Sequence, residues 1–306
     1  MPSLGFLGVP SSAAAHWPGQ EKAPAALRAA GIVKHMGDHG IDVVDYGDRP
    51  TVRWRPLPYE GQPHDMARVL DVLADAREHI GTILEDDRLP LVIGGECTLT
   101  IALVSAALDA GHDVALIYFD GGQDLLSTAA NPEEGGSLDA MGVAHMLDLP
   151  GAASEVAAFG PRRPLLTPDL VYFFGYGEMD DAFAELSSPR VDAGAVARDP
   201  HSAAQEALDA VNGIADRFLI HFDVDVINFF DLPAADVPQY GTGLSLANAM
   251  AALSVLVAHS GLLGMTFAEF NPDHGDADGS TAGTLADALV AALGPDSFSH
   301  GRQSGA

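Results

Sequence analysis

Four aspartates stand in two pairs at the ends of apolar stretches, where their side chains could share a cation. Asp120 and Asp124 follow the apolar run VALIYF, and Asp223 and Asp225 end the segment FLIHFDVDV. Because side chains alternate between the two faces of a strand, His221 is expected on the same face as Asp223 and Asp225. Carboxylates gathered in this way repel one another unless a cation lies between them.

A divalent metal is the usual occupant of such a carboxylate cluster. Oxygen ligands suit Mn²⁺ or Mg²⁺, and one aspartate can bridge two ions. A pair of ions would activate a water molecule near neutral pH. The rival occupant is a guanidinium or amine group, which would neutralise the carboxylates without any metal. These residues leave both interpretations open.

The only cysteine, Cys97, follows another apolar stretch in LVIGGECTLT. As a thiolate ligand it would favour Zn²⁺ or Fe²⁺ over Mn²⁺. It also stands where a helix is expected to begin, a position that lowers a thiol's pKa, so it could act as a nucleophile on a guanidinium carbon. A small buried hydrophobic residue is the third interpretation. A lone cysteine excludes an internal disulfide.

Composition narrows the class of protein. The chain has 306 residues, 47% of them hydrophobic, and a formal net charge of −28. This charge argues against binding to nucleic acid or an anionic membrane, and is compatible with a small cationic substrate. No apolar run approaches the roughly 18 residues of a membrane-spanning helix, and the amino terminus lacks the pattern of a signal peptide. We therefore expect a cytoplasmic protein.

Strands are expected to alternate with helices throughout the chain. We predict strands at 4–9, 41–46, 89–93, 114–119, 170–174, 218–226 and 264–269, and helices at 23–31, 64–84, 98–110, 138–147, 203–217, 244–261 and 281–293. This order predicts an α/β fold with a largely parallel sheet covered by helices on both faces. Ligands of such sheets bind at the carboxyl ends of the strands, where the candidate residues fall. One domain over 1–294 with a flexible tail at 295–306 is expected.

Seven motifs together resemble the arginase, agmatinase and formiminoglutamase family of ureohydrolases. In the family's order they are LGVPSSAAAHWPGQEKAPAALRAAG, VVDYGD, LVIGGECTLT, YFDGGQDL, FFGYGEMD, HFDVDV and EFNPDHGDADGSTAGTLADAL, and they span about residues 4–294. The resemblance implies a three-layer α/β fold with a central, mostly parallel eight-stranded sheet, usually assembled into homotrimers or hexamers. It also implies a hydrolase that cleaves a C–N bond of a linear amidine at two manganese ions.

Two histidine ligands of the family are replaced in this sequence. Cys97 stands in place of the histidine in the GGDHS motif, and Gly122 in place of the second histidine in DAHxD. His221 replaces the serine that precedes the FDVD motif, where it could supply a nitrogen ligand from a new direction or be a hydrogen-bonded core histidine. The metal-ligand candidates are Cys97, Asp120, Asp124, His221, Asp223 and Asp225.

The resemblance also suggests catalytic and substrate-binding residues. Asp139 takes the place of a proton-shuttling histidine, and Glu269 matches the glutamate that grips the substrate's guanidinium. Glu178 and Asp180 lie where arginases place an acid that contacts the substrate's amino group through water. The catalytic candidates are Asp124, Asp139, His221 and Glu269, and the substrate-binding candidates are Glu178, Asp180 and Glu269.

Three hypotheses follow. The first is a hydrolase that acts on a guanidino or related cationic, amino-acid-like substrate at a remodelled metal site, with manganese expected from the family and zinc or iron from Cys97. The second is a metal-free enzyme that uses Cys97 or Asp139. The third is a non-catalytic binding or assembly subunit that holds no metal ion.

Overall fold

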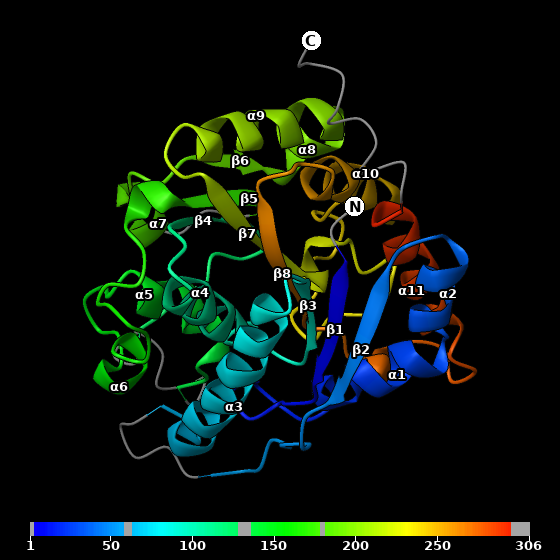
Figure 1. Cartoon of the computed structure of the whole chain (residues 1–306), viewed down its shortest axis with the longest axis horizontal. Coiled ribbons are helices and arrows are strands. Elements are labelled where there is room, and N and C mark those ends of the chain that lie inside the picture. Colours follow the sequence, from blue (N-terminus) through cyan, green and yellow to red (C-terminus); the bar gives the residue numbers. More distant parts are fainter. Residues whose placement is uncertain (1–2, 58–62, 128–135, 178–180, 295–306) are drawn as a thin grey trace.

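Eight parallel strands form the central sheet in the computed structural model of this chain (Figure 1). The structure describes residues 3–57, 63–127, 136–177 and 181–294. The strand order is β2-β1-β3-β8-β7-β4-β5-β6. The strands are β1 (Leu4–Val9), β2 (Val43–Asp48), β3 (Leu89–Gly94), β4 (Val114–Phe119), β5 (Val171–Tyr176), β6 (Arg190–Asp192), β7 (Arg217–Asp223) and β8 (Leu262–Ala268).

Helices cover both faces of this sheet, which confirms the predicted three-layer α/β fold (Figure 1). One face carries α1 (Ala23–Ala29), α2 (Ile32–Asp38), α8 (Ala193–Arg198), α9 (Pro200–Asn212), α10 (Leu246–Val257) and α11 (Ser280–Ala292). The other carries α3 (Met66–Glu85), α4 (Leu99–Asp109), α5 (Gly142–Met146) and α6 (Ser154–Ala157). A further short helix, α7 (Asp181–Glu185), follows β5.

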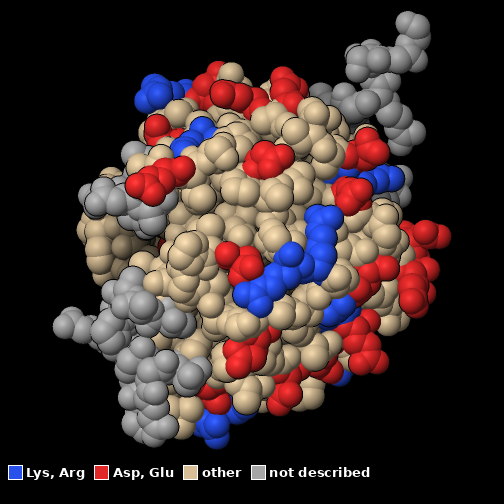
Figure 2. Space-filling model, turned by 90° about the vertical axis from the view of Figure 1, so that its left-hand side faces the viewer, with Lys and Arg blue, Asp and Glu red and all other residues tan. Residues whose placement is uncertain are grey.

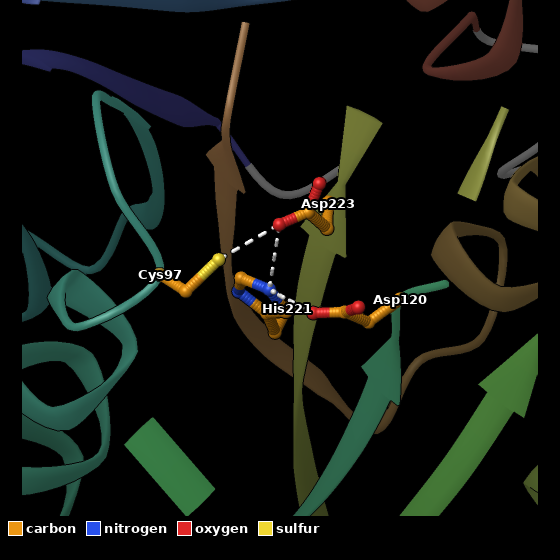
Figure 3. Close-up of side chains that lie close together, drawn as sticks. All are labelled: Cys97, Asp120, His221 and Asp223. Atoms are coloured by element: carbon orange, nitrogen blue, oxygen red, sulfur yellow. Dashed lines mark hydrogen bonds and ion pairs between the residues drawn. The ribbon is translucent and has the colours of Figure 1, made fainter. Parts of the chain in front are cut away.

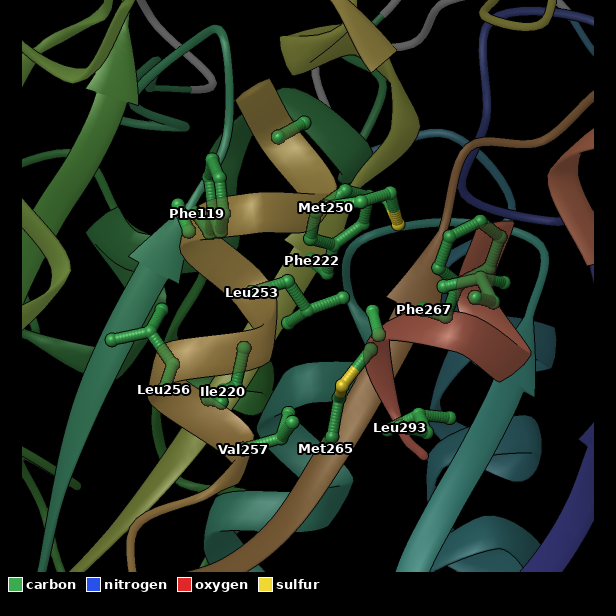
Figure 4. Packing of buried hydrophobic residues seen from close by; sticks show 14 of the residues in the cluster. Phe119, Ile220, Phe222, Met250, Leu253, Leu256, Val257, Met265, Phe267 and Leu293 are labelled. Atoms are coloured by element: carbon green, nitrogen blue, oxygen red, sulfur yellow. The ribbon is translucent and has the colours of Figure 1, made fainter. Parts of the chain in front are cut away.

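The two faces have separate hydrophobic cores because successive strand residues point in opposite directions. Ile220 of β7 packs in the core under α10, whereas its neighbour Leu219 packs in the core under α4. Figure 4 shows Ile220 and Phe222 against Leu253 and Leu256 of α10. Strands buried on both faces read as continuous apolar runs, which is why the sequence predicted them well.

Three predicted boundaries are wrong, each for a local reason. The strand predicted at 218–226 ends at Asp223, because the Asp223 side chain accepts a hydrogen bond of 2.6 Å from the Asp225 N–H and the chain turns. The helix predicted at 203–217 instead runs from Pro200 to Asn212, and Asp199 caps its start. The helix predicted at 23–31 ends at Ala29, and an unpredicted helix, α2, begins after Gly31, which has a left-handed backbone with φ 84°.

Other differences are smaller. The strand predicted at 41–46 lies at 43–48, the helix at 138–147 shortens to a 3₁₀ turn and α5, and the helix at 244–261 shortens to α10. The edge strand β6 has three residues and was not predicted. None of the helices in the described part of the chain has both the length and the apolar character needed to cross a bilayer.

Candidate metal and substrate site

The four central strands deliver the candidate residues to one edge of the sheet. The strands β3, β8, β7 and β4 are neighbours in that order. Cys97 follows β3, Glu269 follows β8, Asp223 ends β7 and Asp120 follows β4. Because the carboxyl ends of parallel strands meet at one edge, residues distant in the sequence converge here.

Four side chains form a compact group of possible ligands, which we call the Cys97 cluster: Cys97, Asp120, His221 and Asp223. Their ligand atoms all lie within 4.8 Å of one another, and all four side chains are buried. Sγ of Cys97 lies 2.7 Å from Oδ2 of Asp223. Nε2 of His221 lies 3.3 Å from Oδ2 of Asp120 and 3.9 Å from Oδ2 of Asp223 (Figure 3).

Two atoms of the Cys97 cluster are buried and have no hydrogen-bond partner among the described residues. They are Nε2 of His221 and Oδ2 of Asp120, which face each other. A buried polar atom without a partner costs free energy, so such atoms usually mark a missing ligand or water. An ion bonded to both atoms would satisfy them.

The ring of His221 is held from its other nitrogen. Nδ1 lies 2.7 Å from the hydroxyl of Thr100 and 3.1 Å from that of Thr266, and the two hydroxyls are 2.9 Å apart. The ring also stacks on Tyr118, with centroids 4.3 Å apart. Metal-binding histidines commonly use one nitrogen in a fixed hydrogen bond and the other for the metal. Sequence reasoning had no signal for Thr100, Thr266 or Tyr118.

Asp124 and Asp225 lie beside this cluster and have protein partners. The hydroxyl of Tyr118 donates to Asp124. The N–H of Gly121 donates to Oδ1 of Asp225 at 2.9 Å. The structure therefore brings four of the six proposed ligands together, while the proposed roles of Asp124 and Asp225 stay predictions.

Asp139 and Glu269 form a second group with Cys97. Ligand atoms of these three residues also lie within 4.8 Å of one another. Oδ1 of Asp139 accepts from the Cys97 N–H at 2.7 Å, and Oε1 of Glu269 lies 3.9 Å from the Cys97 thiol. The side-chain amide of Gln20, a residue the sequence analysis missed, donates to Glu269.

Burial favours the neutral forms of these groups. It raises the pKa of the Cys97 thiol well above its usual range, and the charge of Asp223 adds to the increase. Burial is also the largest cause of the raised carboxyl pKa values of Asp124, Asp223, Asp225 and Glu269. A thiol in this environment is a poor nucleophile without a positive charge beside it.

A cavity of about 500 Å³ opens onto both groups. Its described lining includes seven acidic residues and no Lys or Arg, and its rim includes Trp17, Val237 and Pro238. On the molecular face in Figure 2, Asp and Glu side chains are interspersed with Lys and Arg. The acidic lining of the cavity attracts cations. Glu178 and Asp180 lie outside the described residues, so the structure says nothing of their proposed role.

The donors of the Cys97 cluster fit a divalent ion. A thiol, an imidazole and two carboxylates form a mixed set that suits Zn²⁺ or Fe²⁺ better than Mn²⁺ or Mg²⁺, which prefer oxygen. The unpartnered Nε2 of His221 supports this fit, because its lone pair can face an ion when Nδ1 carries the hydrogen.

Comparisons with known proteins agree on one family. The sequence model described as the arginase family matches residues 2–294. Arginase-1 of Sus scrofa is 25% identical over 308 residues, covering 95% of this chain and 92% of that protein. The crystal structure of arginase from Bacillus subtilis aligns with a TM-score of 0.82 at 21% identity, covering 95% of this chain and 98% of that one. Formimidoylglutamase from the same species aligns with a TM-score of 0.70 at 18% identity, covering 96% and 89%.

Proposed function

Because the chain belongs to the arginase family of ureohydrolases, we propose that it hydrolyses a C–N bond of a guanidino or related cationic substrate at a remodelled metal site. The observation that carries this proposal is the Cys97 cluster, which has two buried ligand atoms without a partner among the described residues and of which Cys97, Asp120 and Asp223 line the cavity. The similar solved structures include both an arginase and a formimidoylglutamase. Membership of the family therefore indicates the type of bond that is cleaved, but not which substrate carries it.

Cys97, Asp120, His221 and Asp223 would hold the ion. When bound, it would supply Lewis-acid activation of water for attack on the substrate carbon. Hydrolysis of a guanidinium adds one water across the C–N bond and gives urea and a protonated amine, which conserves the charge.

The other residues around the cavity would bind and orient the substrate. Glu269 would accept N–H groups of the guanidinium, with its position fixed by the amide of Gln20. Asp139 lines the cavity and is held by the N–H of Cys97, so it would move a proton towards the leaving nitrogen. Asp124, held by Tyr118, would orient the attacking water.

The buried thiol weakens the metal-free alternative. Without a cation, the raised pKa of Cys97 keeps it protonated at neutral pH. A metal ion would provide the positive charge that stabilises the thiolate.

We also propose that the protein is cytoplasmic and forms a homo-oligomer, a trimer or hexamer. Light scattering on the purified chain tests the oligomeric state.

The proposal is tested by loading the purified protein with Zn²⁺, Fe²⁺ or Mn²⁺ and assaying alkylguanidines, guanidino amino acids and formimino amino acids. We expect release of urea or ammonia from one class in the zinc or iron form. Asp223→Ala should remove both the metal and the activity, while Asp113→Ala, at an aspartate whose side chain is 92% exposed, should keep both. A metal-loaded protein that hydrolyses no compound of these classes would contradict the proposal.

A further inference from the structure

Asp236 is a buried carboxylate that neither the motifs nor the Cys97 cluster includes. It is 5% exposed and lines the cavity. Oδ1 accepts a hydrogen bond from the side-chain amide of Asn271 at 2.7 Å. It also accepts one at 2.6 Å from His274 when Nε2 of that imidazole carries the hydrogen. Oδ2 is buried, and no group in the described part of the chain forms a hydrogen bond with it. One oxygen is therefore fixed by the protein while the other remains for a ligand.

The backbone brings Asp236 close to Glu269. Ala235 forms an antiparallel bridge with Phe270, and the N–H of Asn271 donates to the carbonyl of Ala234 at 2.8 Å. Asp236 and Glu269 stand next to the two bridged residues, and both line the cavity. Burial is the largest cause of the raised pKa of Glu269, and the charge of Asp236 adds to it, because like charges at this proximity repel.

Among the described residues that line the cavity there is no Lys or Arg, so no permanently charged side chain neutralises these two carboxylates there. Glu269 accepts hydrogen bonds from two neutral groups, the Gln20 amide and, at 3.9 Å, the Cys97 thiol. Asp236 accepts its hydrogen bonds at Oδ1 only. A planar cation with N–H groups on two edges would satisfy both acids at once, because carboxylates bind such groups in charge-assisted hydrogen bonds.

We propose that Asp236 and Glu269 form a two-carboxylate clamp for the cationic head group of a guanidine or amidine. This inference rests on the proposed function, and it adds Asp236 as a residue that determines specificity. The clamp favours a charged guanidinium over neutral urea, so the product of hydrolysis would leave more readily than the substrate.

Binding of n-butylguanidinium, measured by calorimetry on the zinc-loaded full chain, tests the clamp. Asp236→Asn keeps the size of the side chain and an acceptor for Asn271 and His274, but removes the charge. We expect it to weaken binding about 10- to 100-fold, the usual effect of losing one charge-assisted hydrogen bond. Asp113→Asn, the matched change at the exposed aspartate, should leave the affinity unchanged.

A second pair of variants separates the clamp from a merely structural role. His274→Gln removes the imidazole that bonds Oδ1 but keeps the Asp236 carboxylate, so it should retain the affinity. Asp236→Glu keeps the negative charge on a longer side chain and should therefore retain part of the affinity that Asp236→Asn loses. The clamp is overturned if Asp236→Asn binds n-butylguanidinium as tightly as the wild type, or if His274→Gln loses as much affinity as Asp236→Asn.

The same titrations distinguish this inference from the proposed function. Tight binding to the wild type with equal binding to Asp236→Asn removes only the role of Asp236. Absence of n-butylguanidinium binding to the zinc-loaded wild type overturns the clamp together with the guanidino substrate class. Loss of affinity in Asp236→Asn without any hydrolysis by the wild type supports the clamp and contradicts the hydrolase.

Discussion

Sγ of Cys97 lies 2.7 Å from Oδ2 of Asp223, so the buried thiol donates its proton to a buried carboxylate. This proton lies between two groups that would otherwise both bind an ion. Burial and the charge of Asp223 keep the thiol protonated. Metal binding therefore has to release the proton from Cys97, which makes metal uptake dependent on pH.

The first prediction concerns the thiolate. Loading with Co²⁺ in place of Zn²⁺ should produce the sulfur-to-cobalt absorption band of a Co²⁺ thiolate, because Cys97 would be a direct ligand. Cys97 is the only cysteine, so the band has one possible source. Cys97→Ser should bind Co²⁺ more weakly and lack the band, as recorded by near-ultraviolet spectroscopy. An unchanged spectrum in the serine variant would exclude this ligand.

The second prediction concerns the residues that hold His221. Thr100→Val keeps the shape of the side chain but removes the hydroxyl 2.7 Å from Nδ1. We expect zinc affinity to fall about 10- to 100-fold, as is usual when a histidine ligand loses its outer partner. Competition with a chromogenic chelator measures this. Thr82→Val, at an exposed hydroxyl bonded only within its own helix, is the control and should not change the affinity.

The third prediction restores the histidines that the family pattern contains. A Cβ at Gly122 would meet, within 4 Å, only Oδ1 of Asp120 at a tight 3.3 Å, so it fits once that carboxylate shifts by a few tenths of an ångström. Cys97→His combined with Gly122→His should raise the affinity for Mn²⁺ relative to Zn²⁺, because two imidazoles replace a soft thiolate. Elemental analysis after competitive loading gives the ratio.

Gly122→Ala with Cys97 unchanged is the control for that variant, since it adds the Cβ without a nitrogen. It should keep the wild-type preference. A double-histidine variant that still prefers Zn²⁺ to the wild-type extent would mean that Cys97 does not set the choice of metal.

The fourth prediction concerns stability and pH. Burial lowers the pKa of His145, which uses both nitrogens when neutral: Nδ1 lies 2.6 Å from the Met141 carbonyl, and Nε2 accepts from the Ala153 N–H at 3.0 Å. The unfolded chain therefore binds more protons than the folded one near pH 6. The contribution of neutral His145 to the free energy of unfolding is complete above 6.5, the pKa of the unfolded histidine, and is lost as the pH falls through its lower pKa in the folded protein.

His145→Gln does not titrate and provides the comparison. The difference in melting temperature between wild type and His145→Gln should shrink as the pH falls from about 7.5 to about 5. Thermal denaturation at several pH values measures it. A difference that is constant over this range would mean that His145 is not held neutral.

Much of the fold was accessible from the sequence because the strands are buried on both faces. Short, uninterrupted apolar runs such as VALIYF are typical of strands in a covered parallel sheet, and β4 matches its predicted range, Val114–Phe119. The edge strand β6, with three partly exposed residues, has no such pattern and was missed. Strand propensity also could not predict that the Asp223 side chain would accept a hydrogen bond from the N–H of Asp225 and so end β7.

The candidate site was less accessible because it depends on contacts between distant segments. Strand alternation indicated that His221 and Asp223 share a face, and the structure places both in the Cys97 cluster. Asp236 was missed because its significance comes from lining the same cavity as Glu269, 33 residues further along the chain, next to the bridge between Ala235 and Phe270. The roles of Thr100 and Gln20 likewise follow only from three-dimensional neighbours.

The most direct test of the account is the zinc content of the purified chain after zinc loading and desalting, compared with that of Asp223→Ala and Asp113→Ala. The account predicts at least one retained ion per chain in the wild type and in Asp113→Ala, and none in Asp223→Ala, because Asp223 belongs to the Cys97 cluster and Asp113 is exposed. A wild-type chain that retains no ion, or an Asp223→Ala chain that retains as much zinc as the wild type, would contradict it.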